Sequence, residues 1–154
     1  MRIIGGKFRN KKINFTKNIK TRPLKDSVRE NIFNILIHSN IVDIDFESLN
    51  VLDLYAGSGS FGIECLSRGA SNVIFVEKDL DALFNLKKNI NNINLSKNSK
   101  IISKDISRFF DDIILEHNKK FNIIFLDPPY KDKSFINCLK VIKKNNLLDK
   151  RHIL

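Results

Sequence analysis

Two short segments of this chain carry the residue types and spacing that could do chemistry. The first, residues 53–62, contains the glycine spacing Gly-x-Gly-x-x-Gly, and the second is Asp127-Pro-Pro-Tyr130. Each segment follows or overlaps an apolar run, residues 51–55 and 121–126, that predicts a buried strand. A glycine loop lets a ligand approach the backbone. A carboxylate beside rigid carbonyls and an aromatic ring suits a flat base that bears an amino group.

The glycine loop is typical of proteins that bind nucleotide-like cofactors. Its small residues, Ala56, Gly57, Ser58 and Gly59, permit a tight turn and close contact with a ligand. Glu77 ends the next predicted strand, about 20 residues after Gly57, where its carboxylate could accept hydrogen bonds from both ribose hydroxyls. Dinucleotide oxidoreductases and methyltransferases both use such a loop. An oxidoreductase would leave the Asp127-Pro-Pro-Tyr130 segment without a role.

Two further carboxylates lie on or next to predicted strands. Asp53 stands inside a buried strand, where an unpaired charge is costly. It could meet the ammonium end of a methionine-derived cofactor, hydrogen-bond the amides of the glycine loop, or do both. Asp105 follows the third predicted strand, and it could accept a hydrogen bond from an adenine amino group or cap the next helix. The sequence leaves both pairs of roles open.

The Asp127-Pro-Pro-Tyr130 segment is suited to holding a nucleobase. Two consecutive prolines favour an extended backbone and remove two amide donors, so the carbonyls before and between them become outward acceptors. The Asp127 carboxylate is a further acceptor, and the Tyr130 ring offers a face for stacking. The exocyclic amine of guanine or adenine has two hydrogens that two acceptors can hold. That hold would align the nitrogen for in-line attack on a methyl carbon.

The charge of the chain favours a polyanionic partner. Its 154 residues carry a formal net charge of +10, with a pI near 9.7. No acidic residue occurs in residues 1–25, whose basic side chains are candidates for contact with nucleic acid. These are Arg2, Lys7, Arg9, Lys11, Lys12, Lys17, Lys20, Arg22 and Lys25.

Other site classes find no support in the composition. Cys65 and Cys138 lie in apolar helical patterns and predict small buried side chains rather than a disulfide. The three histidines are scattered without metal-ligand spacing, so no metal is expected. No apolar run is long enough to span a membrane, and the N-terminus lacks the apolar core of a secretory signal. A cytoplasmic location is therefore expected.

Strands and helices alternate through most of the chain. This predicts an α/β fold built on a doubly wound, mostly parallel sheet with helices on both faces. The predicted strands are 51–55, 73–77, 100–103 and 121–126, and the predicted helices are 60–68, 80–93, 107–117 and 134–145. The length fits one domain, in which we expect two parts, a basic RNA-facing extension at residues 1–45 and a core at residues 46–154.

The extension is predicted to hold a hairpin and a helix. The hairpin pairs residues 2–4 with 11–15 through a turn at Gly5-Gly6. The helix runs from Asp26 or Ser27 to about His38, with Arg29 and Glu30 pointing away from an apolar face. That face would contain Val28, Ile32, Ile35 and Leu36.

The last four residues, 151–154, resemble the start of a fifth strand. A sheet that stops there leaves the fourth strand near an edge, and long apolar edges invite further pairing. An oligomer or another partner that covers this edge is therefore expected.

Taken together, these motifs resemble one family of class I S-adenosylmethionine-dependent methyltransferases, the bacterial 16S ribosomal RNA (guanine-N2-)-methyltransferases. The matching segments are Arg2-Ile-Ile-Gly-Gly-Lys-Phe-Arg9, Arg22-Pro-Leu-Lys-Asp-Ser-Val-Arg-Glu-Asn-Ile-Phe-Asn34, Val51-Leu-Asp-Leu-Tyr-Ala-Gly-Ser-Gly-Ser-Phe-Gly-Ile-Glu64 and Phe125-Leu-Asp-Pro-Pro-Tyr130. The resemblance implies a Rossmann-like fold, S-adenosylmethionine as cofactor and ribosomal RNA or the small ribosomal subunit as partner. Members of the family continue through further strands, so the C-terminal strands of the fold are expected to be missing here.

The resemblance also implies three groups of site residues. The target guanine would be held by the catalytic residues Asp127, Pro128 and Tyr130. The cofactor would be bound by Asp53, Tyr55, Ala56, Gly57, Ser58, Gly59, Glu77, Asp105 and Ile106. RNA would be contacted by Arg2, Lys7, Arg9, Lys11, Lys12, Arg22 and Arg29, although Arg22 and Arg29 could instead pair with Asp26 or Glu30.

Two alternatives remain at the level of sequence. An adenine-N6 methyltransferase acting on DNA or RNA would share the Asp127-Pro-Pro-Tyr130 segment. A non-catalytic RNA-binding assembly factor could use a shortened methyltransferase scaffold. The identity of the methylated base separates the first alternative from the guanine enzyme, and the absence of cofactor binding would identify the second.

Overall fold

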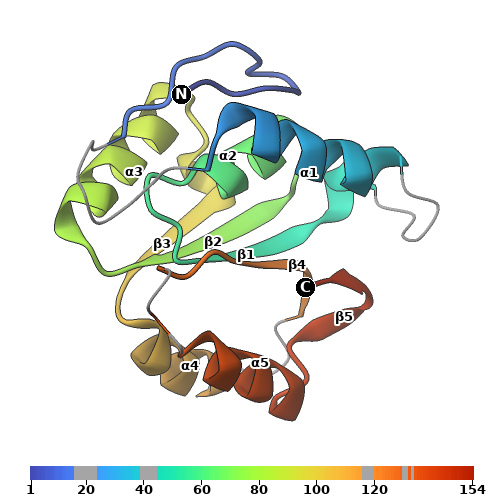
Figure 1. Cartoon of the computed structure of the whole chain (residues 1–154), viewed down its shortest axis with the longest axis vertical. Helices are drawn as coiled ribbons and strands as arrows, with labels where there is room; N and C mark the ends of the chain where they lie inside the picture. Colours follow the sequence, from blue (N-terminus) through green and yellow to red (C-terminus); the bar gives the residue numbers. More distant parts are fainter. Residues whose placement is uncertain (16–23, 39–44, 116–119, 130–131, 133) are drawn as a thin grey trace.

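The fold is built around one five-stranded sheet. The structure, a computed structural model, describes residues 1–15, 24–38, 45–115, 120–129, 132 and 134–154, with the backbone alone at 113–115. The strands lie in the order β3-β2-β1-β4-β5, and every neighbouring pair is parallel (Figure 1). They are β1 (Asn50–Leu54), β2 (Asn72–Glu77), β3 (Ser99–Ser103), β4 (Phe121–Leu126) and β5 (Leu148–Ile153). The predicted α/β fold class is confirmed.

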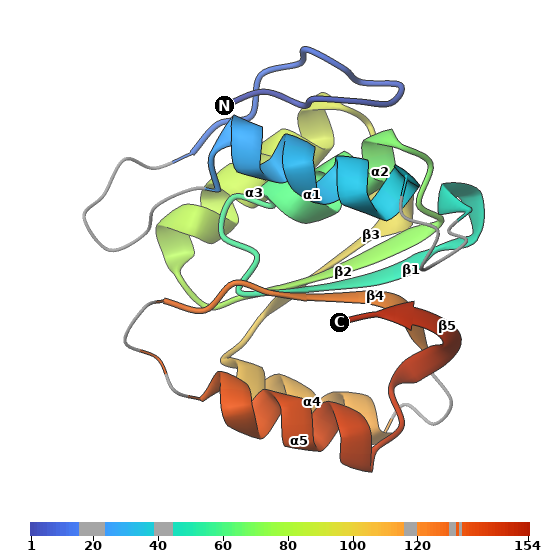
Figure 2. The same ribbon diagram turned by 45° about the vertical axis from the view of Figure 1, so that its right-hand side comes forward.

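Helices cover both faces of the sheet. One face carries α1 (Asp26–His38), α2 (Ser60–Ser67) and α3 (Leu80–Asn92), and the other carries α4 (Ile106–Leu115) and α5 (Phe135–Lys144) (Figures 1 and 2). Two short 3-10 helices, Phe46–Ser48 and Ser96–Asn98, precede β1 and β3. Helix α3 begins where the Asp79 side chain accepts a hydrogen bond from Ala82 N at 2.9 Å.

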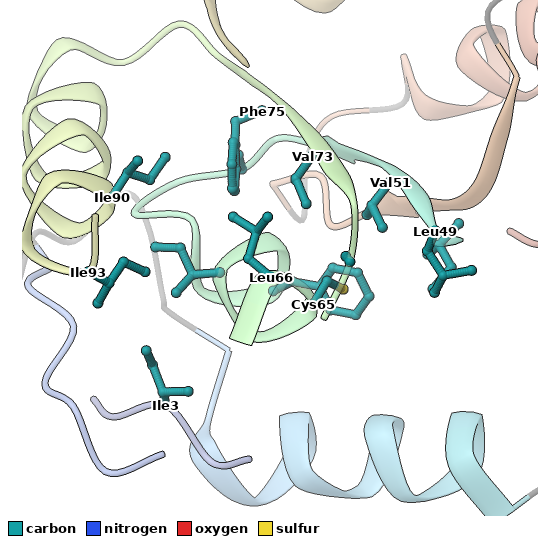
Figure 3. Packing of buried hydrophobic residues seen from close by; sticks show 14 of the residues in the cluster. Ile3, Leu49, Val51, Cys65, Leu66, Val73, Phe75, Ile90 and Ile93 are labelled. Carbon is teal, nitrogen blue, oxygen red and sulfur yellow. The ribbon is translucent and has the colours of Figure 1, made fainter. Parts of the chain in front are cut away.

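The sheet separates two hydrophobic clusters, because successive side chains of a strand point to opposite faces. Val51 belongs to the cluster under α1, α2 and α3, whereas Leu52 belongs to the cluster against α4 and α5. Figure 3 shows the first cluster, in which Phe75 extends from β2 of the sheet and Ile3 lies on the side of the cluster that is away from the sheet. Part of the N-terminal extension is thus packed into the main core.

The N-terminal segment (residues 1–15) forms a wider loop than the predicted hairpin. The predicted antiparallel pairing is confirmed by a bridge between Arg2 and Lys12 and by flanking backbone hydrogen bonds, such as that from Ile3 N to Lys11 O at 2.9 Å, whereas the chain beyond them departs from the sheet pattern. The cause is docking on the last turns of α2. The fully buried Glu64 carboxylate accepts hydrogen bonds from Ile4 N at 2.8 Å and Gly5 N at 2.7 Å. The amides that a tight hairpin would pair internally are therefore used against α2.

Helix α1 lies in its predicted place but presents a different face to the core. Arg29, Phe33 and Leu36 are buried, whereas Val28 and Ile35 are 42% and 64% exposed. The expected apolar face is therefore confirmed at Leu36 and Ile32, which pack in or against the core, and wrong at Val28 and Ile35. Burial of Arg29 is compensated by buried Glu64 of α2, whose Oε2 lies 3.7 Å from Arg29 Nε.

Strand β5 begins earlier than expected and covers β4. It pairs in parallel with β4 at Phe121–Leu148 and Ile123–Ile153, with an irregular register between these points. On this side of the sheet the edge strand is thus β5, and a partner at this edge stays a prediction. Among the described helices, none combines the length and apolar character needed to cross a bilayer.

Candidate cofactor and base-binding site

The two segments singled out in the sequence lie side by side. In the parallel pairing of β1 with β4, Leu54 is directly opposite Leu126. The glycine loop leaves β1 one residue later, and Asp127 follows β4 immediately. Both therefore emerge at the carboxyl edge of the sheet, where ligands bind in open α/β folds (Figure 1).

The glycine loop has an open position at Gly57. Gly57 and Gly59 both have positive φ values, +56° and +83°. A Cβ atom at Gly59 would lie 2.3 Å from Leu86 Cδ1, so Gly59 is required for packing against α3. A Cβ atom at Gly57 would meet nothing within 4 Å. The loop is packed on one side and leaves open space at Gly57, as a ligand that approaches the backbone requires.

Glu77 braces the glycine loop from the end of β2. Its Oε2 accepts a hydrogen bond from Gly57 N at 2.8 Å, and its Oε1 accepts bonds from Lys78 N and Asp79 N, each at 2.8 Å. An ionised carboxylate has about four acceptor positions, so about one position remains on Oε2. Glu77 can therefore accept a ligand hydroxyl without giving up the amide bonds that shape the loop.

Asp53 lies under the start of α2. Its carboxylate is 2% exposed, and Oδ2 accepts a hydrogen bond from Gly62 N at 3.0 Å. Burial raises the pKa of Asp53 to about 7, and the Gly62 bond only partly opposes this effect. Of its two predicted roles, the bond to the loop and helix amides is present, and contact with a cofactor stays a prediction.

The raised pKa of Asp53 predicts a pH-dependent stability. Between about pH 4 and pH 7 the native carboxyl retains a proton that the unfolded chain has released. The free energy of unfolding should therefore fall as pH rises across this range. Asp53→Asn should flatten this part of the profile in denaturant titrations at pH 4.5, 6 and 8. A wild-type slope in the Asp53→Asn variant would show that another group is responsible.

Asp105 has one of its two proposed contacts in the structure. Its Oδ1 accepts hydrogen bonds from Ser107 N and Ser107 Oγ, and Oδ2 pairs with Lys78 Nζ at 2.9 Å. The bonds from Lys78 and Ser107 lower the pKa of Asp105 to about 2. Asp105 thus caps α4, and the adenine contact stays a prediction. The Ile106 side chain packs in the core with Phe109, so any cofactor contact of Ile106 falls to its backbone.

The described part of the Asp127-Pro-Pro-Tyr130 segment faces solvent. Asp127 is exposed, yet neighbouring protein atoms displace part of its hydration and raise its pKa. The Pro129 carbonyl oxygen accepts a hydrogen bond from Asp132 N at 2.8 Å. Tyr130 lies outside the described residues, so its stacking role stays a prediction.

Tyr55 connects the two segments at their bases. Its backbone is left-handed, with φ +60°, and its hydroxyl lies 2.7 Å from Ser134 Oγ at the start of α5. On the opposite face of the sheet, the Phe61 ring of α2 stacks on Phe125 of β4 with a centroid separation of 3.9 Å. The first contact joins the loop after β1 to the start of α5, and the second joins α2 to β4. Ser134 was not anticipated, since nothing local marks a serine as the partner of a tyrosine 79 residues away.

The predicted RNA-contacting residues separate into three groups. Arg2, Lys7, Arg9, Lys11 and Lys12 are all exposed on the N-terminal segment. Arg22 lies outside the described residues. Arg29 is fully buried, and it pairs with Asp26 at 2.9 Å, one of the alternatives open at the level of sequence. This burial corrects the expectation that Arg29 contacts phosphate.

Buried polar side chains, Glu64 and Asn89 among them, hold the N-terminal segment against the core. Glu64 does so through α2, as described above. Asn89 of α3, 3% exposed, accepts a hydrogen bond from Asn14 N at 2.8 Å and donates to Ser58 O at 3.0 Å. It therefore joins the N-terminal segment to the glycine loop. The sequence analysis did not identify Glu64 or Asn89, although each is a polar residue at an apolar position of a helical pattern.

Known proteins match almost the whole chain. The family model described as "Conserved hypothetical protein 95" matches residues 1–154. Ribosomal RNA small subunit methyltransferase D of Buchnera aphidicola (subspecies Acyrthosiphon pisum) is 35% identical over 152 residues, which cover 95% of this chain and 74% of that protein. The protein of that name in Escherichia coli K12 is 31% identical over 148 residues, covering 96% of this chain and 69% of its own length.

The fold agrees with these matches. A solved structure of a hypothetical protein from Thermus thermophilus aligns with a TM-score of 0.80 and 25% identity, covering 97% of this chain and 80% of that one. Two observations support one conclusion. The glycine loop and the Asp-Pro-Pro segment lie at neighbouring strand ends of a parallel Rossmann-like sheet, and the family model matches the full length of the chain. The chain belongs to the Conserved hypothetical protein 95 family, a family of ribosomal RNA methyltransferases.

Proposed function

We propose that this protein transfers a methyl group from S-adenosylmethionine to the exocyclic N2 of a guanine in small-subunit ribosomal RNA. The observation that supports this most directly is the register of β1 against β4. Because Leu54 pairs with Leu126, a cofactor on the glycine loop and a base on Asp127 would be neighbours. The exposed basic N-terminal segment supplies charge for an RNA partner.

The residues around the glycine loop fit this cofactor. S-Adenosylmethionine supplies an electrophilic methyl group on a sulfonium centre. Open space at Gly57 admits a ligand to the backbone, and the remaining acceptor position of Glu77 suits a ribose hydroxyl. Buried Asp53 provides negative potential beneath the loop when ionised, and a cationic ligand would favour that ionised form. Asp105 would accept a hydrogen bond from the adenine amino group of the cofactor.

Asp127 and the prolines act on the base. The N2 amine donates one hydrogen to the Asp127 carboxylate and the other to a carbonyl of the proline pair. This fixes the amine plane and aims its lone pair along the axis of displacement. Positive charge develops on the nitrogen as the new bond forms, and the carboxylate stabilises that charge. The raised pKa of Asp127 also makes it a better acceptor for the proton that the nitrogen then releases.

The decisive experiment is methylation of hypomethylated small ribosomal subunits and of their naked RNA. The protein is incubated with isotopically labelled S-adenosylmethionine, and the modified nucleoside is identified by mass spectrometry. We expect N2-methylguanosine at a single position. N6-Methyladenosine would instead identify the adenine enzyme. Failure to bind the cofactor in a calorimetric titration would identify a non-catalytic assembly factor.

The N-terminal segment should contribute to RNA binding mainly through charge. Replacing Lys11 and Lys12 together by alanine should weaken binding of small-subunit RNA. It should also reduce the slope of log K against log salt concentration by about 1.5 to 2, because two phosphate contacts are lost. Filter binding at several salt concentrations measures this slope. The paired change Lys143→Ala and Lys144→Ala on α5 is the charge-matched control, and equal slopes for the two variants would remove Lys11 and Lys12 from the interface.

A further inference from the structure

The solvent face of α3 carries an unusual pair of exposed apolar side chains. Leu80 and Phe84 are 78% and 68% exposed, the highest values among the large hydrophobic residues in the described part of the chain. They are four residues apart and therefore adjacent on the helix surface. The opposite face, which includes Ala82 and Leu86, is buried against the core. Leu80 and Phe84 thus take no part in packing the fold.

This apolar pair has basic neighbours. Lys87 and Lys88 are exposed in the next turn, and within the described residues neither forms an ion pair. The acidic residue of α3, Asp81, lies in its first turn. An exposed aromatic ring close to two lysines is the combination on which a nucleobase stacks while its phosphates are neutralised.

Helix α3 runs between the proposed cofactor site and the N-terminal segment. Helix α3 begins three residues after Glu77, at the carboxyl edge of the sheet, and its later turns lie beside the N-terminal segment (Figures 1 and 2). Asn89 fixes that second contact, because it accepts a hydrogen bond from Asn14 N at 2.8 Å and donates to Asn14 O at 2.9 Å. Helix α3 thus extends from the carboxyl edge of the sheet to the N-terminal segment, which carries exposed Lys11 and Lys12.

We propose that the α3 face (Leu80, Phe84, Lys87 and Lys88) binds single-stranded RNA next to the target nucleotide, with one unstacked base on the Phe84 ring. The inference rests on the proposed function and specifies its substrate as locally unpaired RNA. A regular duplex would not serve, because its bases are stacked and its major groove is too deep and narrow for side chains to read.

The test compares α3 variants with matched variants on α5, which covers the other face of the sheet. Phe84→Ala and Phe84→Tyr are measured for binding to an unmodified small-subunit RNA transcript, with Ile136→Ala, at a 49% exposed position, as control. Loss of one stacked base should weaken binding about 5- to 100-fold in Phe84→Ala. Phe84→Tyr should retain near wild-type affinity because its ring is kept. S-Adenosylmethionine affinity should be unchanged in all three.

A second experiment tests the charged residues. It compares the double variant Lys87→Ala and Lys88→Ala on α3 with the double variant Lys143→Ala and Lys144→Ala on α5. The α3 pair should lower the salt slope by about 1 to 2, and the α5 pair should leave it unchanged. The proposal is overturned if Phe84→Ala binds RNA as well as Ile136→Ala does. It is also overturned if Phe84→Ala alters only the sedimentation of the free protein, which would reveal a protein–protein contact. Absence of RNA methylation by the wild type would instead refute the proposed function.

Discussion

Replacing Asp127 by alanine should reduce methyl transfer by about 100- to 1,000-fold or more, while the affinity for S-adenosylmethionine stays within a few-fold of wild type. Asp127 extends from the tip of β4, whereas the glycine loop is shaped by β1, α2 and Glu77. The variant therefore removes an acceptor for the target amine and leaves the cofactor loop intact. Single-turnover transfer to small-subunit RNA measures the first quantity, and calorimetric titration measures the second.

Asp127→Asn makes the test sharper. The amide keeps an acceptor oxygen of similar size, but it carries no negative charge and cannot take up a proton. The wild-type rate should fall as pH drops through the raised pKa of Asp127, and the asparagine variant should lack that dependence. Parallel loss of transfer and of cofactor binding in Asp127→Ala would contradict the separation of roles between the two strand tips.

Replacing Glu64 by alanine should lower the free energy of unfolding by about 3–5 kcal/mol, the usual cost of removing one partner from a buried ion pair. Glu64 is fully buried, and its Oε1 lies 2.9 Å from Arg68 Nη2, while Arg29 is the fully buried cation on its other side. Without Glu64, Arg29 keeps the pairing with Asp26 and loses its buried counter-charge. Urea unfolding followed by circular dichroism measures the change.

The same variant should loosen the N-terminal segment more than the rest of the fold. Glu64 accepts the amide hydrogens of Ile4 and Gly5, so hydrogen exchange at these amides should accelerate beyond the global change in stability. Glu30→Ala, on the exposed side of α1, is the matched control and should alter stability by no more than about 0.5 kcal/mol. Equal stability of the Glu64 and Glu30 variants would show that the buried charges do not hold this interface.

Local sequence patterns were sufficient to predict the strands and helices that position the site. The bounds of β4 agree with prediction, and the other strands and helices of the core, apart from β5, agree within two residues. Apolar runs, glycine breaks and amphipathic spacing are properties of consecutive residues, so they can be read without the fold. Alternation of strands and helices also implied parallel pairing, which places every carboxyl strand end, and hence Asp53, Glu77 and Asp127, at one edge.

Long-range pairing decided the remainder. Arg29 follows the outward face of α1 in any local helical pattern, and its burial depends on Glu64, which lies 35 positions further along the chain. The width of the N-terminal loop depends on the same carboxylate. The bonds from Tyr55 to Ser134 and from Asn89 to Asn14 likewise join distant segments. A buried polar group is stable only beside its partner, and which residues become partners is determined by how the helices pack on the sheet.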